Sequence, residues 1–193
     1  LKTNRLIQSV PGTMRFQRGV DDYIFESYSE LNYNAPFIFD RKVLAVNGTF
    51  PRLRKESNNL IQYFNVTLYK ETLIGNHLLS PFVKQNARFY RYELDSIRGD
   101  RYYISFEGKY PNTQMVSGNC IINGRHTTVA EVELNGYYEF MKFKLQMVMG
   151  AYGYEMLLPV SHHLEFLFNY IGNKVQGEYV SMQHYKNVEL VGR

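Results

Sequence analysis

The sequence has no tryptophan and a single cysteine, Cys120, among 193 residues. One cysteine cannot close an internal disulfide and has no partner cysteines for a metal site, which excludes a disulfide framework and a cysteine-ligated metal. No apolar run approaches the length of a membrane-spanning helix, so we do not expect this chain to span a membrane. It also lacks an initiator methionine and an apolar signal segment before its first strands, so we expect a processed or trimmed product.

Charge of one sign is not concentrated anywhere in the chain. The 22 lysines and arginines exceed the 18 aspartates and glutamates by a net charge of +4, but the two signs are interspersed. A nucleic-acid-binding stripe needs clustered basic residues, so we expect no nucleic-acid partner. Hydrophobic residues make up 45% of the chain and aromatic residues 16%. This composition supports a packed core and argues against disorder.

Period-2 alternation runs through most of the second half of the sequence and predicts strands. The segment RFYRYEL, residues 88 to 94, alternates aromatic or apolar residues with charged ones, and RYYISFEG, residues 101 to 108, does the same. Between them, Arg98-Gly99-Asp100 is the tripeptide of many adhesion ligands, but here we interpret it as a hairpin turn. Further strands are expected in QMVSGNCII, TTVAEVEL, FMKFKLQMVM, HLEFLFNY and residues 174 to 185. Asn123-Gly124, Asn135-Gly136 and Gly172-Asn173 are expected to be turns, the first of them tight with positive φ at both residues.

The first part of the chain has a different pattern. Two strands are expected at Tyr23 to Tyr33 and Phe37 to Val46, and one or two short helices between Phe50 and Pro81, where Leu53, Leu60 and Phe64 recur at helical spacing. The apolar segment LIGNHLLSPF follows as a loop. We found no repeat or linker, so residues 1–193 are expected to form one domain with a helical or lid insertion at about residues 50–82.

The predicted fold class is mainly β with a minor helical part (α+β). One or two helices cover only part of a wide apolar sheet face. The sheet must therefore curl, pair with another chain or hold a ligand.

The segment from Leu78 to Leu134 resembles the soluble module of a Bacteroidota envelope family of unknown function. The matching features are a Ser80-Pro81 pair, a Phe-Tyr-x-Tyr strand at residues 89 to 92, a Tyr-x-Ile-x-Phe strand at residues 102 to 106, and a strand with a central glycine, Gly118. That module is similar to the LolA-type lipoprotein carriers. The resemblance implies a curled antiparallel sheet, or half-barrel, with one or two short helices covering its concave side. It also implies an exported protein, periplasmic or associated with the outer membrane.

Methionine content suggests what the concave side does. The strand after residue 140 places Met141, Phe143, Leu145, Met147 and Met149 on one face and lysine or glutamine on the other. Methionine adapts equally to irregular core gaps and to flexible ligands, so this face is either plain core or the wall of an apolar cavity. The predicted cavity residues are Tyr102, Ile104, Phe106, Val116, Val132, Met141, Phe143, Leu145 and Met147. The predicted lid residues are Leu73, Ile74, Leu78, Leu79 and Phe82.

No pattern in the sequence predicts catalysis, a metal or a cofactor. His162 and His163 are neighbours and would point to opposite faces of a strand, so we interpret them as surface or strand-edge residues rather than a chelating pair. Glu131 and Glu133 fit the solvent face of a sheet better than an acid–base pair. Cys120 is expected to be a buried, inert thiol.

Two functions follow as hypotheses. The first is a non-catalytic envelope protein that binds a lipid or acyl chain in a half-barrel cavity. The alternative is a structural or assembly module whose apolar face is filled by its own chain and which acts through contacts with other envelope proteins. An enzyme is the least supported class.

Overall fold

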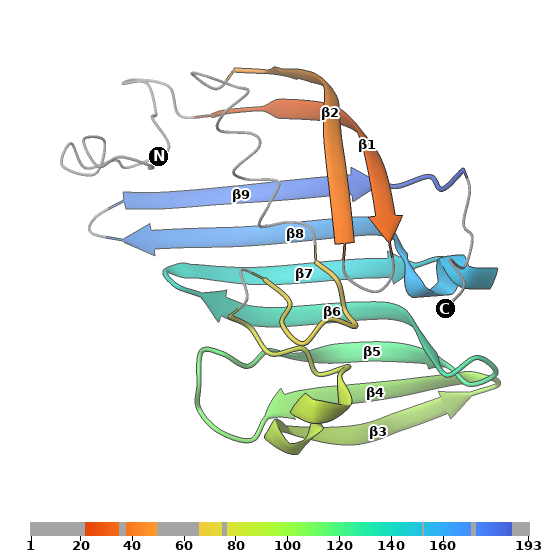
Figure 1. The fold of residues 1–193 in the computed structure, drawn as a ribbon. Helices are drawn as coiled ribbons and strands as arrows, with labels where there is room; N and C mark the ends of the chain where they lie inside the picture. The colour runs from red at the N-terminus through yellow and green to blue at the C-terminus, as the bar shows by residue number, and fades with distance from the viewer. Residues whose placement is uncertain are drawn as a thin grey trace.

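Antiparallel strands dominate the computed structural model, which describes residues 22–34, 38–49, 66–74, 77–151, 153–170 and 173–186 (Figure 1). Strands β1 and β2 form a hairpin, and β3 to β9 form a seven-stranded antiparallel sheet in sequential order. The strands are β1 Phe25–Asn34, β2 Ile38–Gly48, β3 Tyr90–Arg98, β4 Arg101–Gly108, β5 Ser117–Asn123, β6 Thr128–Tyr138, β7 Met141–Met149, β8 Pro159–Tyr170 and β9 Asn173–Met182. This confirms the mainly-β, antiparallel prediction. Within the described residues the large sheet is open, with β3 and β9 at its edges.

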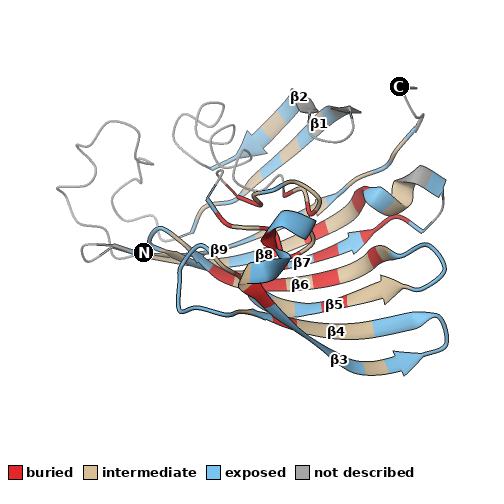
Figure 2. Cartoon of the chain, turned by 60° about the horizontal axis from the view of Figure 1, so that its bottom comes forward, coloured by how far each residue is buried: buried red, intermediate tan, exposed pale blue. Residues whose placement is uncertain are grey.

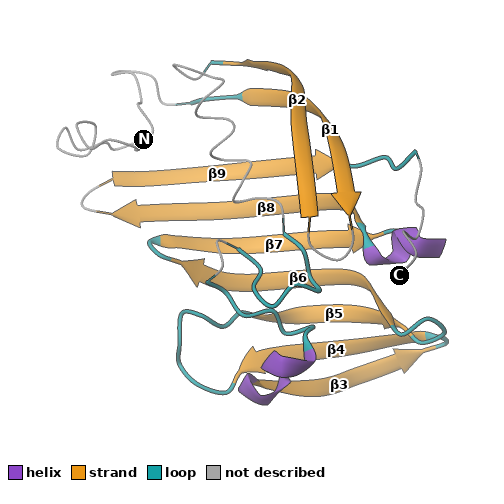
Figure 3. Cartoon of the chain, in the orientation of Figure 1, coloured by secondary structure: helices purple, strands orange, loops and turns teal. Residues whose placement is uncertain are grey.

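The helices that the structure describes lie outside the region where helices were predicted, and residues 50–65 of that region lie outside the described residues. The two described helices are short 3₁₀ segments, η2 at Lys84–Phe89 and η3 at Gly153–Leu157, both outside the predicted region (Figure 3). The described residues 66–74 and 77–81 of that region form turns and an isolated bridge between Thr72 and Leu79 rather than a helix. Leu53, Leu60 and Phe64 lie outside the described residues.

Of the predicted turns, Asn135-Gly136 is wrong, Asn123-Gly124 is right in place but not in type, and Gly99-Asp100 is confirmed, whereas Gly172 lies outside the described residues. Asn135 and Gly136 lie inside β6, where a Cβ on Gly136 would come within 2.9 Å of the Phe143 ring, so this glycine serves packing rather than a turn. The β5–β6 connection is a four-residue turn, Gly124 to Thr127, whose positive φ is at Thr127. The Thr127 N–H closes this turn onto the Asn123 carbonyl, and the Gly124 N–H donates to the Asp100 carbonyl of the neighbouring hairpin, each over 2.7 Å. The turn at Gly99-Asp100 between β3 and β4 is as predicted, with Gly99 at φ 58°.

The large sheet has one apolar and one polar face because its strands alternate. On the polar face Glu133 pairs across the strands with Gln146, and Lys144 Nζ lies 3.0 Å from the Glu133 carboxylate. On the apolar face Val132 pairs with Met147, and Leu134 with Leu145, all four of which are buried. This is the binary pattern of a sheet with one solvated face and one core face.

The apolar face is covered by a non-helical segment that we call the strap, residues 66–74 and 77–83. The strap crosses the middle strands on one side of the sheet, the side that also faces β1 and β2 (Figures 1 and 2). Figure 2 shows that the buried stretches of the middle strands lie beneath it. The strap contributes its own apolar side chains to the core: Val66, Leu68, Leu73, Ile74 and Leu78 are all buried.

Buried polar groups fasten the strap to the start of β3. Ser80 is fully buried, and its hydroxyl donates to the Leu68 carbonyl. The Asn86 amide donates to the carbonyls of Glu71 and Ser80, at 2.8 and 3.0 Å. The Tyr90 hydroxyl donates to the Leu79 carbonyl, 2.6 Å away, and accepts from the Val116 N–H. Leaving such buried groups unpaired costs about 1–3 kcal/mol each, so these bonds hold the strap in one position.

Candidate ligand-binding face

The predicted cavity residues are brought together on the apolar face, and most of them are core. Six are buried in one hydrophobic cluster: Phe106, Val116, Val132, Phe143, Leu145 and Met147. Ile104 packs against that cluster and Met141 is half-buried. Tyr102 stands apart from them, with 37% of its surface exposed.

The predicted lid residues are part of the strap and pack on the same cluster. Leu73, Ile74 and Leu78 are buried, and Leu79 and Phe82 lie against them. The Phe82 ring meets the Phe106 ring edge-to-face, with centroids 5.6 Å apart. The strap therefore fills the space over the middle strands, so a ligand there would have to displace it. The lid role itself stays a prediction.

The apolar face continues past the strap along β3 and β4, where it is largely uncovered; the strap reaches β3 only near its start, where the Tyr92 hydroxyl donates to the Pro81 carbonyl, 2.7 Å away. Tyr92, Leu94 and Ile97 of β3 are 45%, 54% and 55% exposed, and they lie beside Tyr102 of β4. We call these four residues the open flank. In Figure 2 most of β3 and the end of β4 nearest their connecting turn are exposed. An exposed cluster of large apolar side chains on one sheet face is typical of an interaction site.

The sequence showed the open flank only in part. The alternation in RFYRYEL places Tyr92 and Leu94 on one face. It cannot show that β3 is the edge strand, or that the strap meets β3 only near its start, at Tyr90 and Tyr92. Ile97 was missed because a bulge between Leu94 and Ser96 shifts the register by one residue.

One buried polar group lies on the apolar face and was predicted to be a surface or strand-edge residue. His162 pairs with Met147 on the neighbouring strand and is 3% exposed. Burial lowers the pKa of His162 to about 4, although the nearby backbone of Val66 partly offsets this. Its Nδ1 contacts Gln183 Nε2 at 3.2 Å, whereas its Nε2 has no hydrogen-bond partner among the described residues.

His163 lies at the surface and Cys120 is buried, as predicted. His163 lies on the polar face, 2.8 Å from the Glu178 carboxylate, so the two histidines do point to opposite faces. Cys120 is buried, and burial raises the pKa of its thiol to about 11. A thiol that stays protonated at neutral pH is a poor nucleophile, in line with the inert role expected.

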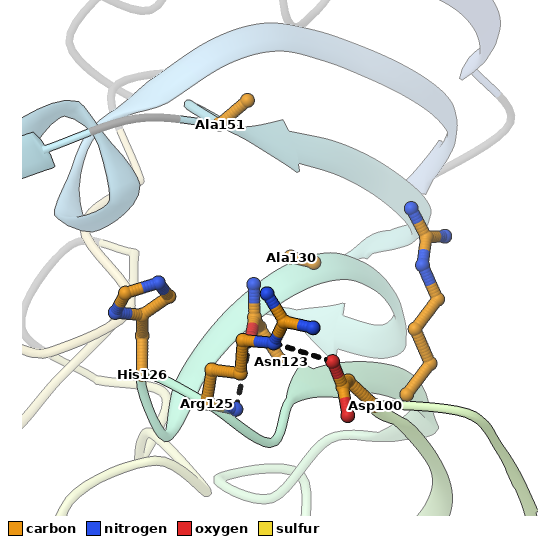
Figure 4. Close-up of a pocket in the computed structure, with 7 residues that line it drawn as sticks. Asp100, Asn123, Arg125, His126, Ala130 and Ala151 are labelled. Atoms are coloured by element: carbon orange, nitrogen blue, oxygen red, sulfur yellow. Dashed lines mark hydrogen bonds and ion pairs between the residues drawn. The ribbon is translucent and has the colours of Figure 1, made fainter.

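A polar hollow of about 320 Å³ lies beside the β3–β4 and β5–β6 turns (Figure 4). It is lined by Asp100, Arg101, Asn123, Arg125, His126, Ala130 and Ala151. Its charges are already paired, since Arg125 Nε lies 2.5 Å from the Asp100 carboxylate and Arg101 lies 3.3 Å from Glu131. The Arg-Gly-Asp tripeptide therefore has its aspartate engaged within the chain. None of the predicted cavity or lid residues lines this hollow.

A family model matches residues 3–186 of the chain, and it describes a family of unknown function, DUF5686. The chain belongs to the DUF5686 family. No curated protein and no solved structure matches this DUF5686 chain. The family assignment confirms membership of an uncharacterised family and adds no activity. Among the described residues of this DUF5686 member, no helix has the length and apolar character needed to cross a membrane.

Proposed function

We propose that this protein is a non-catalytic component of the bacterial envelope that binds a lipid or another acyl-bearing molecule. In this proposal residues 1–193 form one LolA-like domain whose sheet curls as a half-barrel, located in the periplasm or at the outer membrane. The observation that supports it best is the open flank. Its four side chains continue the apolar face that the strap covers elsewhere.

The position of the open flank suits an acyl chain. Leu94 pairs with Ile104, which packs against the core, and Tyr92 pairs with the buried Phe106. The exposed side chains are therefore continuous with the core rather than isolated. A chain laid along them would remove apolar surface from water on both partners, at about 25 cal/mol per Å². In this proposal the ligand lies beside the strap, and the strap is a fixed wall rather than a swinging lid.

A fluorescent acylglycerol without charge tests the proposal. We expect the wild type to bind it and Leu94→Asp to bind it at least tenfold more weakly, because binding would then have to remove the carboxylate from water. The matched control is Val180→Asp, since Val180 is 57% exposed on the opposite face of the other edge strand. The proposal is wrong if the wild type does not bind the probe, or if the two variants weaken it equally.

A second function is favoured by the strap residues Leu73, Ile74 and Leu78, which are buried against the apolar face of the sheet. A sheet whose middle is filled by its own chain fits a structural or assembly module that acts through protein contacts. Native mass spectrometry of protein purified from bacterial envelopes separates the two. Bound lipid supports the first function, and a clean mass across preparations supports the second.

A further inference from the structure

We propose that the open flank docks on an anionic lipid bilayer, with the basic residues around η2 binding the headgroups. This inference rests on the proposed function, because it names the source from which the acyl ligand arrives. It is carried by the distribution of charge about the flank and by the shape of the β3 edge.

The acidic residues of the β3–β4 hairpin lie on the polar face, away from the flank. Glu93 pairs with Ser105, and the Ser105 hydroxyl donates to the Asp95 carboxylate, 3.0 Å away. Glu107 lies 3.6 Å from Arg91. Because side chains alternate along a strand, these groups point away from the face that carries Tyr92 and Leu94. The flank itself therefore presents apolar atoms without negative charge from its own strands.

Basic residues instead border the flank at the end where η2 lies. Lys84 and Arg88 are exposed on η2, which sits on the strap side of β3 and β4 (Figure 1). The Arg88 guanidinium lies 4.7 Å from the centroid of the Phe89 ring, and Lys109 Nζ donates to the Arg88 carbonyl at 2.9 Å. The strap places one acidic residue near this end, Glu71, whose backbone carbonyl accepts from Asn86. Its single negative charge is smaller than the three positive charges of Lys84, Arg88 and Lys109. Apolar and aromatic side chains bordered by cations match a bilayer surface with acidic headgroups.

The β3 edge is poorly suited to the main alternative, a protein that adds a strand. The bulge between Leu94 and Ser96 interrupts the regular ladder in the middle of the flank. A bulge at an edge disfavours the pairing of another strand along that edge. A fluid bilayer does not need that ladder, and it can take up the tyrosines at its interface.

Cosedimentation with phosphatidylcholine vesicles, with and without phosphatidylglycerol, tests the proposal. We expect binding only when phosphatidylglycerol is present, and loss of binding at high salt because the attraction is screened. Leu94→Asp should abolish binding. The double variant Lys84→Gln/Arg88→Gln should weaken it roughly 25-fold, since each cation near an anionic surface contributes about a fivefold effect. The matched control Lys142→Gln/Lys174→Gln removes two exposed cations elsewhere on the sheet and should change binding little.

The outcomes separate this inference from the proposed function. If the uncharged acylglycerol binds but no vesicle does, bilayer docking is overturned and ligand binding stands. If vesicles bind and the acylglycerol does not, the docking surface stands and the carrier function fails. Equal weakening by both double variants would also overturn the proposal, because binding would then follow net charge alone. So would concentration-dependent dimerisation that Leu94→Asp removes without any vesicle binding.

Discussion

Replacing Met147 with lysine is expected to lower the free energy of unfolding by about 4 kcal/mol or more, or to prevent folding. Met147 is 1% exposed and sits between Val132 and His162 on the neighbouring strands. A lysine there would carry a charge into the core beside Val132 and His162, neither of which is acidic. Chemical denaturation of the wild type and of Met147→Lys measures the difference in their free energies of unfolding.

The adjacent residue supplies the control. Val148 is 43% exposed on the polar face of the same strand, so Val148→Lys should change stability by no more than about 0.5 kcal/mol. If Met147→Lys were as stable as Val148→Lys, the space beneath the strap would have to be a wet cavity rather than core. The original cavity prediction would then apply to Met147.

Acidification is expected to destabilise the protein through His162 by about 3 kcal/mol. The folded-state pKa is about 4, below the ordinary value of 6.5, so the unfolded chain binds the extra proton first as pH falls. The contribution is fully present above pH 6.5, is lost as pH falls toward 4, and is constant below that. Each unit of difference corresponds to about 1.4 kcal/mol.

Unfolding free energies of the wild type, His162→Leu and His163→Gln between pH 7 and 4 measure this effect. His162→Leu should lose most of the pH dependence in that window. His163→Gln should keep it, because its side chain lies on the solvated face beside Glu178. Equal pH dependence in the wild type and His162→Leu would contradict a lowered pKa of His162 in the folded state.

The strands were predictable because each carries its own alternation, which needs no knowledge of neighbours. The glycines were harder to interpret. An Asn-Gly pair has the same sequence whether it turns the chain or lies under an aromatic ring, and only the position of Phe143 shows that Gly136 does the latter. Gly118, which the sequence predicted at the centre of a strand, is the second residue of β5, and a Cβ there would come within 1.8 Å of the Glu133 carbonyl oxygen on the adjoining strand.

The sequence predicted which face of the sheet would be apolar, but not where that face would remain exposed. Alternation placed Ile104, Phe106 and Met147 on one side of the sheet. The strap has no periodicity, so the sequence could not show that Leu73 and Leu78 pack on that side and fill its middle. Nor could it show that β3 ends the sheet, which is what leaves Leu94 exposed. Both facts depend on contacts between segments far apart in the chain.

Photo-crosslinking with a diazirine-bearing acylglycerol tests the central claim most directly, because it maps where an acyl chain lies. The open-flank account predicts that peptides containing Tyr92, Leu94, Ile97 and Tyr102 carry the adducts, and that unlabelled acylglycerol competes them away. Peptides from the strap and from β9 should carry few. Adducts spread equally over Val180 and Met182 on the opposite face, or no competed adduct on the flank, would contradict the account.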